Sequence, residues 1–314
     1  MNQSVLAPLG VQAAHIASLW WALLIVSTVV FVLVMCGLIT AVVRSRRTAG
    51  ADGAPPSDSV LSRIVATAVG LTVVTLFGWL IASLVTGRAV GALHAEHALT
   101  VEVVGHQWWW EVHYDADEPS ARVTTANEMH LPVHRPVAIR VTSRDVIHSL
   151  WIPTLQGKRD LIPGRETVVW MQADAPGMVR GQCAEFCGMQ HAHMALNVIA
   201  ESDADFERWR TNLRRSAPQP TDVDAHRGQA IFLTARCAGC HTVRGIDAAG
   251  LVGPDLTHLA ARSSIGAGTL ANTPADLEHW IRNPQAFKPG TQMPPSPLPS
   301  DDLRALVSYL ETLQ

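Results

Sequence analysis

Charge is scarce in this sequence, and neither sign dominates. The 314 residues include 24 Lys and Arg against 27 Asp and Glu, which leaves a net charge of −3 at neutral pH. A protein that binds nucleic acid through its phosphates needs a clear excess of basic residues. The composition therefore argues against a nucleic-acid partner.

Two long stretches contain no charged residue at all. Residues 17–43 and 64–86 each exceed the roughly 20 apolar residues that a helix needs to cross a bilayer. Residues 1–15 contain no Lys or Arg, and the first run is too long for the hydrophobic region of a cleaved signal peptide. We therefore predict two transmembrane helices.

The basic residues around these stretches predict their orientation. Four arginines lie between the two spans: Arg44, Arg46, Arg47 and Arg63. Because basic loops stay on the cytoplasmic side, both termini and everything after Gly87 are expected outside the cytoplasm. We expect an integral protein of a bacterial-type inner (cell) membrane.

Cysteine is also sparse, which leaves no pair for a structural disulfide. Of the five cysteines, Cys36 lies in the first apolar stretch, where a thiol behaves as a small hydrophobic group. The other four belong to two short motifs.

The first motif, residues 183–194, reads C-A-E-F-C-G-M-Q-H-A-H-M. Thiolate, thioether and imidazole are ligands that copper favours, so a copper centre for electron transfer is predicted from Cys183, Cys187, His191 and Met194. An exported cysteine pair can instead form a disulfide, but a disulfide does not require the nearby imidazole and thioether. His148, in D-V-I-H-S-L-W, is the candidate for a further ligand from a separate loop.

The residues around the first motif are typical of strands. Residues 99–174 are rich in β-branched and aromatic side chains between turn signals, which predicts an antiparallel β-barrel or sandwich. Val137, Ile139 and Val141 alternate with more polar positions, as in a strand with one buried face. The metal loop is expected between two late strands, with residues 194–200 forming the last.

The second motif, C-A-G-C-H, contains Cys237, Cys240 and His241 and is the attachment signature of a c-type haem. A redox dithiol and half of a zinc site are the alternatives, and the expected export and helical context favour haem. Met293, the single methionine of the last domain, is the predicted second axial ligand. His258 and His279 are the competing candidates.

The C-terminal domain is expected to be helical. Helices are predicted over residues 223–234, from Thr273–Pro274 to about Asn283, and from Ser300 onward with one apolar face. The predicted divisions are 1–97 for the membrane hairpin, 98–201 for the copper domain, 202–221 for a helix and Pro-rich linker, and 222–314 for the cytochrome domain.

The copper loop, together with G-H-Q-W-W-W, D-V-I-H-S and I-P-G-R, resembles subunit II of cytochrome c oxidase, whose cupredoxin-like domain holds the binuclear copper A centre. The resemblance implies that Cys183 and Cys187 bridge two coppers and that Met194 is a weak ligand. It also implies that His148 and His191 each complete one copper. The C-terminal region resembles a class I cytochrome c, with G-P-D-L after the haem motif.

The resemblance assigns roles to two further residues. Glu185 offers its backbone carbonyl to one copper, and its carboxylate to a magnesium ion shared with subunit I. Trp108 occupies the position through which electrons reach the copper centre from cytochrome c. The family often has a carboxylate just after the second span that serves a proton channel, and we leave that role unassigned between Glu96 and His94.

These features imply a subunit that accepts electrons for a haem–copper oxidase. The expected route runs from an external cytochrome c or similar donor to covalent haem c, then to copper A, then to subunit I, where oxygen is reduced to water and protons are pumped. Subunit I and other oxidase subunits are the expected partners. The alternatives are the equivalent subunit of a nitric-oxide reductase and a membrane-anchored electron carrier or copper-delivery protein that works alone.

Overall fold

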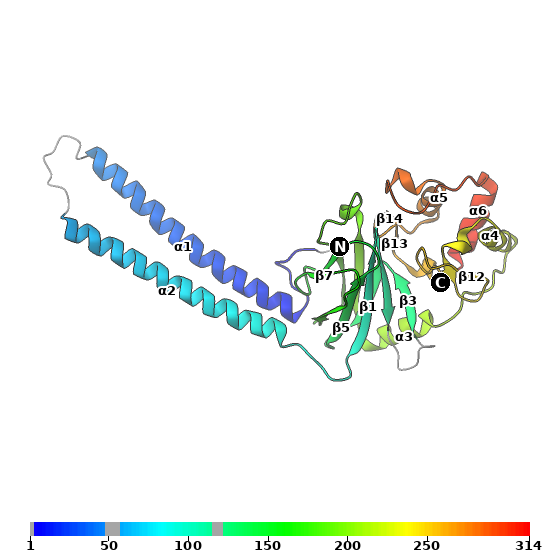
Figure 1. Cartoon of the computed structure of the whole chain (residues 1–314), viewed down its shortest axis with the longest axis horizontal. Coiled ribbons are helices and arrows are strands. Elements are labelled where there is room, and N and C mark those ends of the chain that lie inside the picture. The colour runs from blue at the N-terminus through cyan, green and yellow to red at the C-terminus, as the bar shows by residue number, and fades with distance from the viewer. Residues whose placement is uncertain (1–2, 48–56, 115–121) are drawn as a thin grey trace. The chain divides into compact units, whose positions relative to one another are not determined.

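The computed structural model describes residues 3–47, 57–114 and 122–314. The chain divides into two units, residues 14–92 and a second unit that joins residues 1–13 to residues 93–314. Figure 1 shows two long helices in blue and cyan, α1 (Val11–Arg47) and α2 (Asp58–Gly91). Both are long and apolar enough to cross a membrane, and their most apolar windows are not buried inside the protein. The two predicted apolar helices are therefore present, each longer than its uncharged stretch.

A β-sandwich forms the core of the second unit (Figure 1). One five-stranded sheet has the order β3-β2-β1-β5-β8, and its strands are β1 (Leu99–His106), β2 (Trp109–Tyr114), β3 (Val123–Ala126), β5 (Val137–Ser143) and β8 (Thr167–Met171). The other has the order β4-β10-β9-β6-β7, and its strands are β4 (Glu128–Pro132), β6 (His148–Trp151), β7 (Arg159–Leu161), β9 (Gly177–Cys183) and β10 (Ala195–Glu201).

The sheets are mixed rather than purely antiparallel, which corrects the sequence-based expectation. Strand β1 pairs in parallel with β5, and β10 pairs in parallel with β4. Alternation of apolar and polar residues indicates which face of a strand is buried, but it carries no information about the direction of the neighbouring strand.

Burial follows the predicted alternation except at Ala138, which is also buried. Val137, Ile139 and Val141 of β5 are fully buried, whereas Arg140 and Thr142 are partly exposed. The inner faces of both sheets pack into one apolar cluster, which stabilises the sandwich by removing these side chains from water. Helix α3 (Asp203–Leu213) adds Phe206 and Leu213 to the same cluster.

The C-terminal domain has its own apolar core, which is built mainly by α4 (Val223–Thr234), α5 (Pro274–Arg282) and α6 (Ser300–Glu311). Two short 3-10 helices accompany them, η3 (Cys237–Gly239) and η4 (Leu259–Ala261). Two two-stranded ribbons are also present, β11–β12 (Thr242–Val243 and Ala248–Ala249) and β13–β14 (Ser264–Ile265 and Leu270–Ala271). A further 3-10 turn, η5 (Pro284–Ala286), follows α5. The domain is thus predominantly helical with small β ribbons.

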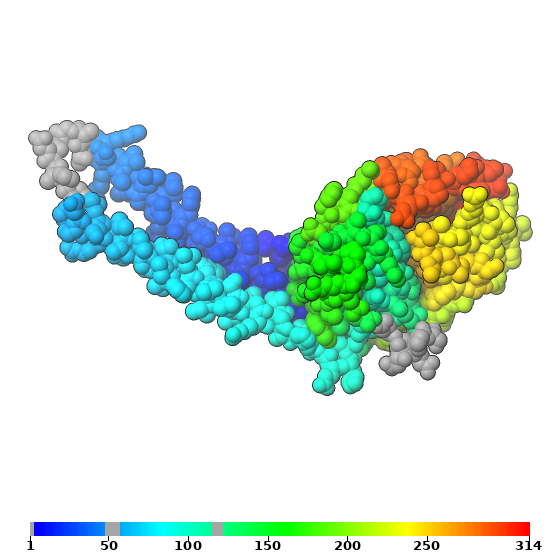
Figure 2. All heavy atoms as spheres, viewed as in Figure 1, coloured from blue at the N-terminus to red at the C-terminus, as the bar shows by residue number. Residues whose placement is uncertain are grey.

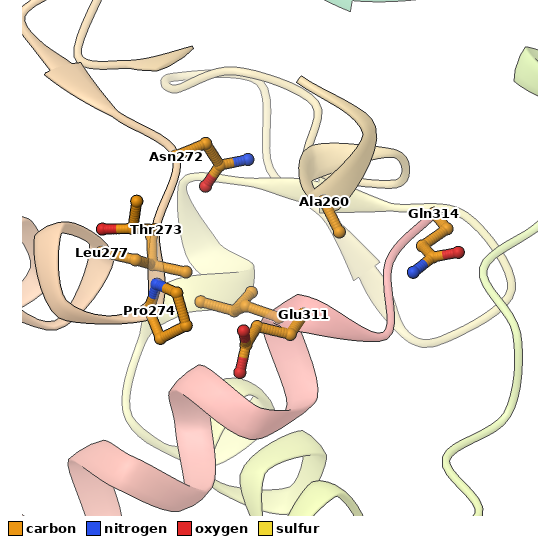
Figure 3. Close-up of a pocket in the computed structure, with 8 residues that line it drawn as sticks. Ala260, Asn272, Thr273, Pro274, Leu277, Glu311 and Gln314 are labelled. Atoms are coloured by element: carbon orange, nitrogen blue, oxygen red, sulfur yellow. The ribbon is translucent and has the colours of Figure 1, made fainter. Parts of the chain in front are cut away.

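Helix boundaries here match the capping signals. The Thr273 hydroxyl accepts a hydrogen bond from the Asp276 backbone N–H at the start of α5, and Pro274 occupies the first turn. A hollow of about 170 Å³ lies between the start of α5 and the end of α6 (Figure 3). Its lining includes Asn272 and Glu311 but no residue of either cysteine motif, so it is separate from the sites described next.

Candidate copper and haem sites

The ends of three neighbouring strands position the first motif. Cys183 is the last residue of β9, and its backbone N–H donates to the Met194 carbonyl at 3.1 Å, just before β10 begins. This bond closes the loop at its base. His148 is the first residue of β6, the other neighbour of β9, and so lies at the start of a strand rather than within the separate loop that was predicted.

The sulfur and imidazole groups of the motif converge. The Cys183 and Cys187 Sγ atoms are 3.7 Å apart, too far for a disulfide, and all five cysteines of the chain are free. Cys183 Sγ lies 3.9 Å from His148 Nδ1, and Cys187 Sγ lies 3.7 Å from His191 Nδ1 and 4.0 Å from Met194 Sδ. The structure therefore brings together all five soft donors that the sequence nominated.

Two residues that the sequence analysis missed hold His148 in place. Asp145 lies 2.8 Å from His148 Nε2, which leaves Nδ1 facing the sulfur cluster. Metal-binding histidines usually have such a carboxylate partner on the second nitrogen. Gly105 provides the space, because a Cβ there would approach His148 Cδ2 to 2.8 Å. The D-x-x-H spacing could have indicated Asp145 as the partner of His148. Nothing in the sequence around Gly105 indicates its role.

The electrostatics of the cluster suit a cation. The hydrogen bond between the two sulfurs lowers the pKa of the Cys183 thiol to about 3. The same contact raises the pKa of Cys187, because a second negative charge would lie beside the first. Although burial opposes it, the Asp145 carboxylate and the Cys183 sulfur raise the pKa of His148. Copper that displaces these protons would convert the cluster into thiolate and neutral imidazole ligands, so the donor set fits the metal.

Glu185 and Trp108 both adjoin the cluster. The Glu185 carbonyl oxygen lies 3.2 Å from Cys183 Sγ, while its carboxylate contacts Lys158 Nζ at 3.4 Å near the surface. The Trp108 indole is 8% exposed and its N–H donates to the Cys187 carbonyl at 2.9 Å. Trp109 is less buried than Trp110, in keeping with the alternation of the two faces along β2.

The second motif folds around His241. Cys237 begins η3, and Cys240 follows it. His241 Nδ1 lies 2.8 Å from the Pro254 carbonyl, and burial lowers the pKa of this histidine, so the neutral ring has Nε2 available for a metal. Gly253 is required at its position because a Cβ would approach His241 Cε1 to 2.5 Å.

The candidates for the opposite axial ligand differ in their surroundings. Met293 is partly buried and packs on the same apolar core as Cys237. His258 has backbone carbonyls 2.7 Å from Nδ1 and 3.1 Å from Nε2, so both of its nitrogens are engaged. His279 is exposed on α5. Two free thiols, an imidazole with an available nitrogen and a nearby thioether fit a covalently attached haem.

Two segments of the chain match known protein families. Residues 115–201 match the family described as "Cytochrome C oxidase subunit II, periplasmic domain", and residues 225–314 match the cytochrome c family. The chain is 36% identical over 220 residues to cytochrome c oxidase subunit 2 of Alkalihalophilus pseudofirmus, a match that covers 70% of this chain and 62% of the relative. It is 32% identical over 231 residues to that of Bacillus sp. strain PS3, covering 70% and 63%.

A solved structure of a related domain is also similar. The crystal structure of the periplasmic domain of subunit II of cytochrome oxidase from Bradyrhizobium japonicum is 30% identical, with a TM-score of 0.36 over 39% of this chain and 97% of that one. The present chain spans less than two thirds of the length of the two curated relatives.

The fold and its sites define a protein in which two apolar helices precede a cupredoxin-like domain and a cytochrome c domain. More particularly, the chain combines a periplasmic domain of the cytochrome c oxidase subunit II family with a domain of the cytochrome c family.

Proposed function

We propose that this chain is the subunit through which electrons enter a haem–copper oxidase. The observation that carries the proposal is the convergence of two free thiols, two imidazoles and a thioether at spacings of 3.7 to 4.0 Å at one end of the sandwich. Such a donor set favours copper, and copper and haem each supply reversible one-electron chemistry.

Each residue of the cluster has a role in this proposal. Cys183 and Cys187 bridge two coppers, and His148 and His191 complete one copper each. Met194 and the Glu185 carbonyl are weaker ligands. The short loop between β9 and β10 holds these groups on rigid strands, so that little has to move when an electron arrives.

The cytochrome domain holds covalent haem c. Cys237 and Cys240 form the thioether links, and His241 and Met293 are the axial ligands. A Met/His pair favours a higher reduction potential than two histidines, which suits a carrier that feeds an oxidase. Electrons from an external donor then pass from the haem domain to the copper domain and on to subunit I, where oxygen reduction drives proton pumping.

Trp108 is the residue at which electrons reach the copper domain. The support is its indole N–H, which donates to the carbonyl of the bridging Cys187 at 2.9 Å. Glu185 is the residue that contributes to a magnesium ion. The support is its exposed carboxylate next to the copper cluster, and the proposal is that magnesium takes its further ligands from subunit I.

The two apolar helices anchor the chain in the membrane, with both termini and both redox domains on the extracytoplasmic side. The arginines at the end of α1 support this orientation through the positive-inside preference. Subunit I and other oxidase subunits are the partners.

The test is spectroscopic. The intact complex is purified with this chain, and its copper, haem c and paramagnetic resonance spectrum are measured. We expect two coppers with a seven-line signal and one low-spin haem per chain. Cys187→Ser should abolish the copper signal and keep the haem, whereas Cys240→Ser should impair haem attachment and keep the copper. Iron without copper on the purified chain would contradict the proposal.

A further inference from the structure

Lys288 is an unusual basic residue for this chain. It is one of only two lysines, and its side chain is 2% exposed. Its amine donates to the Trp108 carbonyl at 2.7 Å and to the Gly266 carbonyl at 2.9 Å. Within the described residues Lys288 forms no ion pair, and burial lowers the pKa of its amine to about 7. Burying an amine costs free energy unless its N–H groups are hydrogen-bonded. The two hydrogen bonds therefore account for the buried position of Lys288.

The two carbonyls belong to different domains. Trp108 precedes β2 of the sandwich, whereas Gly266 lies in the turn between β13 and β14 of the cytochrome domain. Lys288 belongs to the cytochrome domain. Its amine therefore hydrogen-bonds both to a turn of its own domain and to the copper domain.

Further hydrogen bonds join the same two domains. Gln190 of the copper loop donates to the Pro289 carbonyl at 2.8 Å, and the Ala195 N–H donates to the Ala267 carbonyl at 3.1 Å. Asn197 of β10 donates to two serine hydroxyls of the cytochrome domain, Ser263 and Ser264, both at 3.0 Å. The space-filling view shows the orange C-terminal atoms directly against those of the sandwich (Figure 2).

The same loop covers the Trp108 indole. A Cβ built on Gly290 would lie 3.5 Å from Trp108 Cη2 and 3.5 Å from Met189 Sδ, which means that the backbone at Gly290 lies next to the ring. Met293, the proposed haem ligand, follows three residues later. One short loop thus carries both the proposed haem ligand and a contact with Trp108, whose indole donates to the Cys187 carbonyl.

We propose that Lys288 is a positioning residue that holds the cytochrome domain in a docked arrangement over Trp108. In this arrangement the copper centre accepts electrons from the tethered haem domain and is closed to an external donor at Trp108. The inference rests on the proposed function for its electron-transfer role, but the docked arrangement itself can be tested without metal or activity.

Amine acylation of the purified full-length chain in detergent, without the other oxidase subunits, tests the docking. Lys158, whose side chain is 51% exposed, serves as the internal reference because it is the only other lysine. We expect mass spectrometry to find Lys288 modified roughly tenfold or more slowly than Lys158 in the native protein, and at a similar rate after denaturation. Equal native rates would overturn the proposal.

A variant that leaves the amine in place strengthens this test. Asn197→Ala removes the two hydrogen bonds to Ser263 and Ser264 while Lys288 remains available for labelling. We expect Lys288 to become severalfold more reactive in this variant. The matched control is Asn212→Ala in α3, which should leave the labelling of Lys288 unchanged. Unchanged labelling in Asn197→Ala would mean that these contacts do not hold the domain.

The positioning role is tested by Lys288→Met, with Arg208→Met, at an exposed position of α3, as the control. After photoreduction of the haem, electron transfer to copper should slow by roughly tenfold or more in Lys288→Met, because small displacements of a donor have large effects on rate. The optical and paramagnetic resonance spectra of both centres should stay unchanged, which separates lost positioning from lost metal. Wild-type transfer in a folded, fully loaded Lys288→Met protein would refute the role. Absence of copper or haem in the wild-type protein would instead refute the proposed function.

Discussion

Asp145 lies 2.8 Å from Nε2 of His148 and orients the ring so that its other nitrogen faces the Cys183 sulfur. Asp145 is itself fixed, because it accepts hydrogen bonds from the backbone N–H groups of Gln107 and Val146. The turn after β5 therefore carries a carboxylate whose position is set by backbone, and that carboxylate sets the position of a predicted copper ligand.

Replacing Asp145 should weaken copper binding without removing a ligand. We expect Asp145→Asn to lower copper affinity by about 10- to 100-fold, since partners of metal ligands typically contribute that much. Competition with a chelator of known affinity measures the effect. Asp247→Asn, at an exposed position of the cytochrome domain, is the control. Equal affinities of the two variants would show that Asp145 does not support the site.

Gly253→Ala should disturb the haem histidine. The added methyl group would approach His241 Cε1 to 2.5 Å, so the ring must shift, and overpacking of this kind costs about 1–3 kcal/mol. We expect a lower melting temperature of the cytochrome domain and a smaller low-spin haem fraction. Gly239→Ala, within the haem motif but with open space around it, should behave like wild type. A normal haem spectrum in Gly253→Ala would contradict the predicted crowding.

Met293→His should lower the haem reduction potential. If Met293 is the axial ligand, two histidines replace a Met/His pair, and the potential should fall by roughly a tenth of a volt or more, within the ~0.8 V range that axial ligands set. Potentiometric titration of the full chain provides the measurement. Met178→His, at an exposed position of the sandwich, is the control. If the potential and spectrum of Met293→His match those of the control, another residue binds the iron.

The surroundings of Glu111 predict that the free energy of unfolding depends on pH. Burial opposes ionisation, but hydrogen bonds from His106 and His113 outweigh it and hold the pKa of Glu111 well below its ordinary value of 4.5. A depressed carboxyl pKa stabilises the folded state above pH 4.5, and this contribution is lost as the pH falls below that value. We expect Glu111→Gln to lose about 1–2 kcal/mol at pH 7.

Thermal unfolding of the full chain in detergent at several pH values measures this effect. The difference between wild type and Glu111→Gln should shrink as the pH falls below about 4.5. Glu278→Gln, whose partner Arg282 lies on the exposed side of α5, should show little difference at any pH. A constant deficit of Glu111→Gln across the range would mean that its charge is not the source of stability.

Local patterns in the sequence predicted much of the fold. The apolar runs gave both long helices, and Thr273 with Pro274 gave the start of α5. The copper donors were visible because four of them belong to one loop, and the fifth, His148, has a recognisable context in the family. The strand directions were not visible, because the partner of each strand is chosen by tertiary packing.

The residues of the site that the sequence did not predict depend on contacts between residues far apart in the chain. Gly105 is a glycine because the His148 ring lies against it, and no neighbour of Gly105 in the sequence reveals that. Lys288, in F-K-P-G-T, reads as an ordinary turn residue until the structure buries it beside Trp108. Sequence spacing thus identifies ligands within one loop better than it identifies the groups that support them.

Both groups that accept a hydrogen bond from the Lys288 amine are backbone carbonyls, which every residue possesses. A substitution at Trp108 can therefore leave its carbonyl in place, and no matching change at position 288 is required. Evolutionary covariation between positions 108 and 288 should accordingly be weak, and a survey of paired substitutions across relatives would overlook this contact even where it is retained.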